Sequence, residues 1–498
     1  MEKATSTRDS PHSPKAVASA SPEGRTPDAR LPFERDFDRL LFSAPVRRMA
    51  DKTQVFPLEQ HDSVRNRLTH SHEVSNLARS LGNDVVRNTP TLMTSRPEEN
   101  AAIPVILGAV GLSHDVGNPP FGHQGEKAIG EWFSDRRQWI FDRQTVAEDA
   151  KHVDTAAPYS TEFTDFEGNA QSLRLLTKLQ VSRDGYGLDL TLATLAASMK
   201  YTVGAKGVST DKTSRTAANK KYGFFASEAQ LFERVKTHTG LLDLRRHPLT
   251  WLMEAADDIA YSVLDVEDSI EKGLVSFREV KEMLHRQHEK GPADGKDPVI
   301  GRVLAALDNA VERVQARNIS ASEEDDVYVQ ILRASAISEL VGAAGATFRS
   351  SWPAIALYEH TESIIESSAG AALAKALQDF AREKAFNNAG VLALELSGRR
   401  AVLDLMGWFW QGISQRENFN DPGSRRTNHF ANLAYRRISE NYRRVFENDE
   451  PRDGEGQRLS IRYRELRLLT DMISGMTDGY AMQTHAELGR IHAEYAGK

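Results

Sequence analysis

The chain of 498 residues contains no cysteine. Disulfides, thiolate zinc sites and cysteine nucleophiles are therefore excluded, and any metal must be held by histidine, carboxylates, carbonyl groups or water. Long apolar runs are also scarce. The longest, AAIPVILGAVGL at 101–112, is nearer the length of a buried helix than the eighteen or so residues of a membrane span. We therefore expect no membrane-spanning segment and a cytoplasmic location.

Positive charge is not in excess, since the formal net charge is -7. This balance argues against a protein built mainly to coat nucleic acid, although a local basic patch could still bind phosphates. The arginine clusters Arg436-Arg437 and Arg443-Arg444 are typical of solvated helix faces. They keep single-strand binding or nucleotide sensing open as an alternative function.

The order of polar and apolar segments predicts a mainly α fold. Residues 1–30 are rich in Ser, Pro and charge and have no apolar core like that of a secretory signal, which indicates a disordered tail. From residue 31 onward apolar residues recur at spacings of three and four, and only the segment around Arg183-Asp184-Gly185 suggests a short hairpin. We expect a catalytic core at 31–285, an insertion or hinge segment at 286–325, and a C-terminal helical region at 326–498 that completes the pocket and the oligomer contacts.

The pair His114-Asp115 is the first candidate for chemistry. With 15 histidines in the chain, roughly one His-Asp dipeptide is expected by composition alone, and a second pair is present at His61-Asp62. His61-Asp62 lies among polar residues. His114-Asp115 instead ends an apolar run and precedes Gly-Asn-Pro-Pro, which breaks a helix at the pair. His114-Asp115 is therefore the better candidate.

Hard metal ligands occur at four places beside apolar helices: His70, His114, Asp115 and Asp257. Two imidazoles and two carboxylates with coordination positions left over suit Mn or Mg, or Fe, Ni or Co, better than a closed structural zinc. Such a cation could lower the pKa of water and neutralise charge at phosphorus, which favours hydrolysis of a phosphate ester.

His123 and Glu126 follow in the same segment, three residues apart, so they share one helix face if the glycines there open a new helix. A carboxylate beside an imidazole fixes its tautomer and favours its protonated form, as a proton donor to a leaving oxygen requires. The alternative, without a chemical role, is an exposed histidine at a helix start with a glutamate in the first turn, where acidic residues are common.

Asp257, Tyr261 and Asp265 fall at i, i+4 and i+8, so a single helix would present them along one stripe. A metal-bound substrate could be recognised along that stripe. An acidic amphipathic helix with the tyrosine in the core would give the same pattern.

Taken together, these motifs resemble the HD-superfamily deoxyguanosine triphosphate triphosphohydrolases. The similarity runs through RNRLTHSHEV, HDVGNPPFGHQGE, FEGNAQ, KKYGFF, EAADDIAY and LLTDMISGMTDGYA in that order, and it covers almost all of the chain after the tail. It implies an HD-type helical fold with an additional C-terminal helical region and small insertions. It also implies hydrolysis of deoxynucleoside triphosphates to deoxynucleoside and tripolyphosphate.

The resemblance also implies roles for individual residues. The metal ligands would be His70, His114, Asp115 and Asp257, with His123 and Glu126 serving the chemistry at the α-phosphorus. Substrate contacts would come from Gln54 and Asp265 to the 3′-hydroxyl, Val55 and Tyr261 against C2′, Arg67 to phosphate, and Lys200 or Lys221 to the triphosphate. Asn169 and Glu167 would lie in the pocket wall or behind it.

The family is commonly oligomeric, so the resemblance implies a homo-oligomer, a hexamer by analogy, with activation by nucleotide or metal; single-stranded DNA is a further candidate effector. The alternative within enzymes is an HD-type nucleotidase or phosphodiesterase. The set His123, Glu126, Tyr261 and Asp265 separates the two, because monoester hydrolysis does not need it.

Overall fold

The computed structural model describes most of the chain after the first 28 residues. Its described residues are 29–59, 61–89, 97–142, 154–182, 185–211, 215–291, 295–315 and 320–496. The expected tail at 1–30 lies almost wholly outside them. The described chain divides into two compact units, each formed by segments that are distant in sequence. Unit 1 consists of residues 59–112 and 247–393, and unit 2 consists of residues up to 58, 113–246 and from 394 onward.

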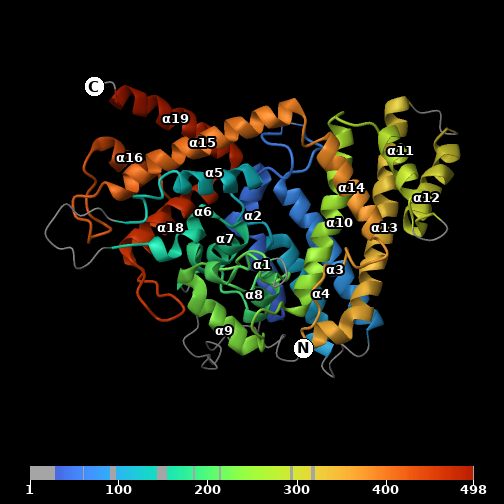
Figure 1. Ribbon diagram of the computed structural model, residues 1–498, viewed down its shortest axis with the longest axis horizontal. Coiled ribbons are helices and arrows are strands. Elements are labelled where there is room, and N and C mark those ends of the chain that lie inside the picture. Colours follow the sequence, from blue (N-terminus) through green and yellow to red (C-terminus); the bar gives the residue numbers. More distant parts are fainter. Residues whose placement is uncertain are drawn as a thin grey trace. The chain divides into compact units, whose positions relative to one another are not determined.

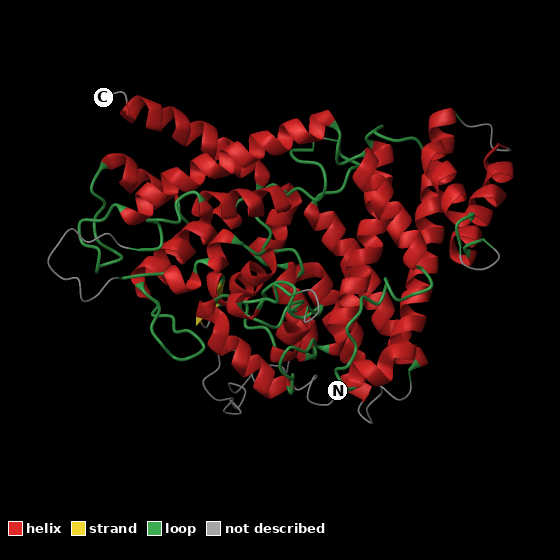
Figure 2. Cartoon of the chain, in the orientation of Figure 1, coloured by secondary structure: helices red, strands yellow, loops and turns green. Residues whose placement is uncertain are grey.

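Helices make up nearly all the regular structure of the described residues, as expected (Figures 1 and 2). The helices of unit 1 are α3 (Arg67–Asn88), α4 (Pro97–Ser113), α10 (Pro248–Glu271), α11 (Phe277–His288), α12 (Pro298–Gln315), α13 (Ala321–Ala356) and α14 (Ala371–Lys384). α4 ends at the first residue of unit 2, and α15 (Ala389–Ser414) also begins in one unit and ends in the other.

Unit 2 contains shorter elements. They are α1 (Pro32–Leu41), α2 (Ala44–Arg48), η1 (Met49–Asp51), α5 (Gly122–Ser134), η3 (Ala157–Tyr159), α6 (Thr161–Thr164), α7 (Gly168–Arg174), η4 (Leu175–Leu179), α8 (Leu192–Ser198), η5 (Ala205–Gly207), η6 (Ala226–Glu228), α9 (Ala229–Thr239), α16 (His429–Arg437), α17 (Glu440–Asn448), α18 (Ile461–Ser474) and α19 (Asp478–Ala496). The expected hairpin is present as β1 (Val181–Ser182) and β2 (Gly185–Tyr186), which pair antiparallel. The turn residues 183 and 184 lie outside the described residues.

The core of unit 1 forms around α10, which packs against α3, α13 and α14 (Figure 1). α10 begins at Pro248 after an N-cap residue, His247, whose side chain accepts from the amide of Leu249. Proline is well suited to this first position because its missing N–H would have no partner there anyway. Most side chains of α10 are buried against these neighbours. Asp257 and Asp265 therefore lie on a helix that is held in place by its packing.

One helix in the described residues, Glu323–Ala356 within α13, is long and apolar enough by composition to cross a membrane, which differs from our expectation of none. Its eighteen-residue apolar window is 33% buried, and α13 packs against α10 and α12. Core helices of other proteins pass the same test, and the alanine and glycine content that raises the hydropathy here also permits close packing.

The core of unit 2 is aromatic. Trp132 and Phe133 on α5 meet edge to face with ring centroids 5.2 Å apart, and Phe133 lies 5.2 Å from Phe163. Tyr463 of α18 contacts Phe163 in the same manner at 5.6 Å. Such pairs add about 1 kcal/mol each to the burial of their rings. This packing fixes α5, whose first turn carries two of the candidate site residues.

Candidate functional site

In unit 2, the helix break at His114-Asp115 occurs where the sequence predicts it. α4 ends at Ser113, and the following turn is held by the amide of Gly117, which donates to Ser172 Oγ at 3.0 Å. Asn118 Nδ2 donates to Asp115 Oδ1 at 2.9 Å. His114 is buried, and its Nε2 lies 3.4 Å from Asp115 Oδ2. One imidazole and one carboxylate are therefore held close together at the end of a buried helix.

Unit 1 holds a second pair of the same kind. His70 lies one turn into α3, whose start is fixed by reciprocal hydrogen bonds between Asn66 and Thr69. His70 Nε2 lies 3.3 Å from Asp257 Oδ1 on α10, and the imidazole is almost fully buried whereas the carboxylate is partly exposed. Residues 187 positions apart are thus adjacent, as a shared role requires.

The other His-Asp dipeptide has a different setting. His61 is exposed and its Nδ1 bonds the hydroxyl of Ser63 at 2.8 Å. Asp62 is exposed as well. His61-Asp62 therefore lies at the surface, unlike the buried His114.

The first turn of α5 presents His123 and Glu126 as the spacing predicts. Phe121 enters the helix at φ 62°, and Gly122 follows at φ 54°, a left-handed conformation that glycine adopts freely. Gly125 also has to be glycine, because a Cβ there would lie 2.0 Å from the carbonyl oxygen of Pro120. The two glycines of this motif therefore shape the turn that displays His123.

His123 and Glu126 form a direct pair. His123 Nδ1 lies 2.7 Å from Glu126 Oε2, and the imidazole side chain is 81% exposed whereas the glutamate is 11% exposed. The other carboxylate oxygen, Oε1, accepts from the amide of Gly168 at 2.9 Å. Gly168 permits this approach, since a Cβ there would lie 2.9 Å from Glu126 Oε1 and 2.2 Å from Asn118 Oδ1. A buried carboxylate thus holds an imidazole whose far edge faces solvent.

Electrostatics keep Glu126 ionised. Burial by itself would raise the pKa of this carboxyl, but the hydrogen bond and charge of His123, the charge of Lys221 and the Gly168 amide together lower that pKa below its ordinary value. The carboxylate is therefore charged at neutral pH and favours the protonated form of its histidine partner.

Of the two candidate lysines, Lys200 and Lys221, it is Lys221 that lies in this cluster. Its Nζ lies 2.6 Å from Glu167 Oε2, while Asn169 Nδ2 donates to Glu167 Oε1 at 2.6 Å. Burial would lower the pKa of Lys221, but the charges of Glu167 and Glu126 raise it above its usual value. Glu167 thus joins the segment FEGNAQ to Lys221, a relation with no trace in sequence spacing.

Lys200 lies just after α8, and its carbonyl oxygen accepts from Arg246 Nε at 2.7 Å. Arg67 is the first residue of α3 and is 5% exposed. Their phosphate contacts stay predictions.

Gln54 and Val55, also in unit 2, are half-buried and follow a firmly anchored residue. Thr53 donates through both its amide, at 3.0 Å, and its hydroxyl to Asp478 Oδ2. Among the described residues, no hydrogen-bond partner meets the buried Oε1 of Gln54. An amide oxygen held in this way suits recognition of a hydroxyl group.

Tyr261 and Asp265 lie on α10 of unit 1 at the expected helical spacing from Asp257. Asp265 is 1% exposed, and its Oδ2 is buried without a hydrogen-bond partner in the described part of the chain. Burial, reinforced by the charge of Asp268 and opposed by Arg65, raises its pKa well above the usual value. Burial and the charge of Asp265 likewise raise the pKa of Tyr261, which Arg382 opposes. Burial therefore favours the neutral, hydrogen-bonding form of both groups.

Comparison with known proteins gives close relatives along nearly the whole chain. A deoxyguanosinetriphosphate triphosphohydrolase-like protein of Listeria innocua serovar 6a is 35% identical over 472 residues, which are 93% of this chain and 95% of the relative. Deoxyguanosinetriphosphate triphosphohydrolases of Salmonella paratyphi A and Klebsiella pneumoniae are 31% and 30% identical, each over 92% of this chain and 93% of the relative. No protein-family model matches the chain.

Proposed function

Because the chain belongs to the deoxyguanosinetriphosphate triphosphohydrolase family, and is thus a hydrolase, we propose that it cleaves deoxynucleoside triphosphates of the dGTP type. Water adds to the α-phosphorus and the bond to the nucleoside 5′-oxygen breaks, so that one deoxynucleoside and one tripolyphosphate leave for each water consumed. The observation that supports this reaction most directly is the His123–Glu126 pair, with its exposed imidazole on a buried, ionised carboxylate.

In this proposal His123 donates a proton to the departing 5′-oxygen. The step requires an imidazolium within reach of the substrate; the His123 side chain is 81% exposed, and the Glu126 carboxylate at Nδ1 favours the protonated form. The amide of Gly168 holds the second oxygen of Glu126, so the carboxylate cannot rotate away from the ring. The proposed nucleophile is water, and the absence of cysteine excludes a thiol in that role.

We also propose that His70, His114, Asp115 and Asp257 hold one divalent cation, Mn²⁺ or Mg²⁺, with Fe, Ni or Co as alternatives. His70, His114 and Asp115 can each offer one ligand atom to such an ion, and the donor types suit metals that retain open positions. When bound, the ion would lower the pKa of water and neutralise negative charge on the phosphate. The donor types fit this role, because each imidazole lies beside a carboxylate, His70 beside Asp257 and His114 beside Asp115.

Selection of deoxyribose would come from Gln54 and Asp265 at the 3′-hydroxyl and from Val55 and Tyr261 against C2′. A close apolar wall rejects an added hydroxyl because it offers neither volume nor a partner. Arg67, Lys200 and Lys221 would meet the triphosphate, with Asn169 in the pocket wall, and a guanidinium fork matches phosphate oxygens well. Of the two lysines, Lys221 is favoured by its link with Glu126 and Glu167.

The proposed setting is a cytoplasmic homo-oligomer, a hexamer by analogy with the family, with a nucleotide or single-stranded DNA as effector. Light scattering with and without nucleotide tests the assembly, and a stable monomer under both conditions would contradict it.

The reaction is tested by incubating the purified protein with Mn²⁺ or Mg²⁺ and each dNTP, followed by anion-exchange analysis of the products. We expect tripolyphosphate and deoxynucleoside in equal amounts. Release of orthophosphate or pyrophosphate without tripolyphosphate would contradict the proposal and favour a nucleotidase or phosphodiesterase. The variant His123→Ala should keep its bound metal and lose turnover, whereas His61→Ala should behave as wild type.

A further inference from the structure

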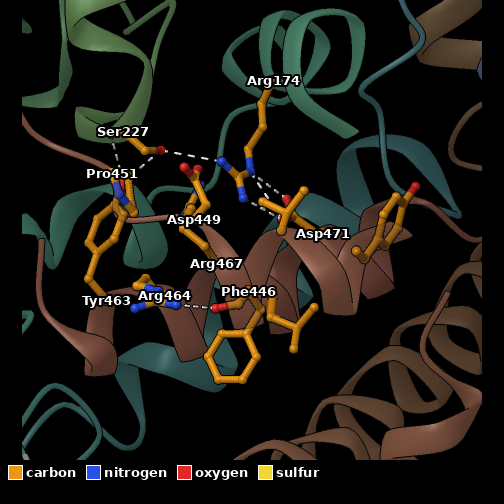
Figure 3. Close-up of a pocket in the computed structure, with 12 residues that line it drawn as sticks. Arg174, Ser227, Phe446, Asp449, Pro451, Tyr463, Arg464, Arg467 and Asp471 are labelled. Atoms are coloured by element: carbon orange, nitrogen blue, oxygen red, sulfur yellow. Dashed lines mark hydrogen bonds and ion pairs between the residues drawn. The ribbon is translucent and has the colours of Figure 1, made fainter. Parts of the chain in front are cut away.

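Unit 2 contains a pocket on the side of α18 that none of the proposed chemistry uses (Figure 3). It has about 310 Å³ of space, part of it open to solvent, and lies among residues of α7, α17 and α18. The charged side chains that line it are Arg174, Arg464, Arg467, Asp449 and Asp471. Three guanidinium groups therefore face two carboxylates across a small space.

Two of these five groups neutralise each other, and a third is already paired. Arg174 donates to Asp471 through Nε and Nη2, each at 2.8 Å, and to Glu228 through Nη1 at 2.8 Å (Figure 3). Asp449 forms an ion pair with Lys178 at 2.9 Å. Both aspartates are therefore already paired with other cations.

Arg464 and Arg467 are less well compensated, because the charges of Asp449 and Glu450 act on Arg464, and that of Glu162 on Arg467, without a direct ion pair. Arg464 donates Nη2 to the carbonyl oxygen of Phe446, and Arg467 donates Nη2 to the carbonyl oxygen of Glu162 at 3.3 Å. Within the described residues, neither forms an ion pair with a carboxylate. The Nε atoms of both, and Nη1 of Arg467, are buried there without an acceptor. These side chains are only 6% and 2% exposed.

A buried guanidinium with unmet donors is costly unless an anion or several acceptors meet it. The ring faces of Phe225 and Phe163, 3.7 and 4.2 Å from the Arg467 guanidinium carbon, offset part of this cost. Glu162, on which the charge of Arg467 acts, is fully buried, and burial raises its pKa to about 7 against that opposing charge. It is therefore only partly ionised at neutral pH, and positive charge remains on this side of α18.

We propose that this pocket binds a phosphate group, in its simplest form inorganic phosphate, with Arg464 and Arg467 donating to its oxygens. Three guanidinium nitrogens without acceptors need a ligand with several acceptor oxygens and a charge of at least −1, and a tetrahedral oxyanion provides both. Ser227 also lines the pocket (Figure 3), but its hydroxyl already donates to Glu228 Oε2 at 2.8 Å, so the arginines carry the proposed binding. This binding does not depend on the proposed hydrolysis.

The first experiment is calorimetric titration of the full chain with inorganic phosphate at constant ionic strength, without divalent metal. We expect saturable binding that weakens at least tenfold in Arg464→Gln. The matched control is Arg400→Gln, an exposed arginine on α15 that pairs with Asp404 at 2.8 Å, and it should bind as wild type does. Equal binding by wild type, Arg464→Gln and Arg464→Lys would overturn the proposal.

Further arms with tripolyphosphate and deoxyadenosine monophosphate identify the source of the phosphate group. Only the part of their binding that Arg464→Gln removes belongs to this pocket, since either ligand could also bind at the proposed active site. If Arg464→Gln weakens the binding of phosphate, tripolyphosphate and deoxyadenosine monophosphate alike, the pocket recognises the phosphate group itself. If it weakens the binding of one of them only, that compound is the ligand of the pocket.

If Arg464→Gln does not fold, as judged by circular dichroism, hydrogen exchange on the wild-type protein decides. Phosphate should slow amide exchange in α17 and α18 relative to chloride at equal ionic strength. Arg464→Lys, which keeps the charge but loses the fork, should give weaker protection. Equal exchange of these two helices in phosphate and chloride would overturn the proposal.

Discussion

His123 Nδ1 lies 2.7 Å from Oε2 of Glu126, one helical turn further along α5. Because the glutamate is buried and the histidine is exposed, this bond joins a fixed charge to a side chain that can reach a substrate. The replacement Glu126→Gln keeps the shape and removes the charge. We expect kcat to fall about 100-fold or more, a typical contribution of an oriented acid–base group, with little change in KM. Steady-state kinetics with dGTP measure both constants.

The matched control for this variant is Glu131→Gln, on the same helix, where Glu131 pairs with Arg399. Its kcat should stay within about twofold of wild type, because surface ion pairs contribute little. A similar loss in both variants would mean that Glu126 acts through the stability of α5 and not through His123.

Lys221 provides a second prediction, on pH dependence. The charge of Lys221 is one of the causes that lower the pKa of Glu126, so Lys221→Gln should raise that pKa. Activity that needs the carboxylate is present above its pKa and is lost as pH falls through it. The acidic limb of the kcat/KM profile should therefore move to higher pH in Lys221→Gln. The neighbouring variant Lys220→Gln should leave the limb in place, and an unshifted limb in both variants would contradict the electrostatic link.

Metal dependence is a third prediction. Dialysis against a chelator should abolish turnover, and added Mn²⁺ or Mg²⁺ should restore it. His114→Ala and Asp257→Asn should lose both bound metal, measured by elemental analysis, and at least about 100-fold in kcat, as expected when a catalytic ion is lost. His61→Ala should keep both, since His61 bonds only its own turn at the surface. Full activity of a metal-free preparation would exclude this role.

Selectivity for deoxyribose is the fourth prediction. Val55→Ala should raise kcat/KM for GTP relative to dGTP by about tenfold. The change removes methyl groups from the proposed wall at C2′, and such apolar contacts discriminate between substrates by roughly 1–3 kcal/mol. Parallel assays with the two nucleotides give the ratio. Val46→Ala, a change at a buried core valine of α2, should lower stability without altering it. An unchanged ratio in Val55→Ala would place Val55 away from the sugar.

The fifth prediction concerns stability and Glu162. Burial raises the pKa of this carboxyl from 4.5 to about 7, so the folded state binds more protons than the unfolded state between these values. Its stabilising contribution is complete below pH 4.5 and is lost as pH rises through about 7. Over that window the free energy of unfolding should fall by at most about 3 kcal/mol through this group. Urea unfolding at several pH values should give a flatter profile for Glu162→Gln, and an equally steep one would contradict the assignment.

Local spacing predicted those parts of the site that lie on one helix. His123 with Glu126, and Asp257 with Tyr261 and Asp265, are neighbours because three and four residues make one turn, and the glycines and prolines marked where α4 ends and α5 begins. Composition and periodicity were likewise sufficient for the mainly α fold.

Contacts between residues that are distant in the chain could not be predicted from the sequence. Glu167 and Lys221 have no periodic relation, and Arg174 reaches Asp471 across 297 positions. After α7 the chain forms a π-helical turn at Leu175–Leu179, where Thr177 Oγ1 donates to the carbonyl of Leu173, and the spacing of apolar residues does not indicate this change. Such contacts depend on which helix faces meet, and a pattern along one helix does not contain that information.

Asp478, the first residue of α19, holds two distant segments at once. Its two oxygens accept from Thr53, next to Gln54, and from the amide of Phe121 at 2.9 Å, two residues before His123. Asp478 therefore ties the loop that carries Gln54 to the start of α5, where the proposed acid–base pair lies. Proteolysis that removes Asp478 should lower turnover before it unfolds the protein, so intact mass should be checked before any preparation is judged inactive.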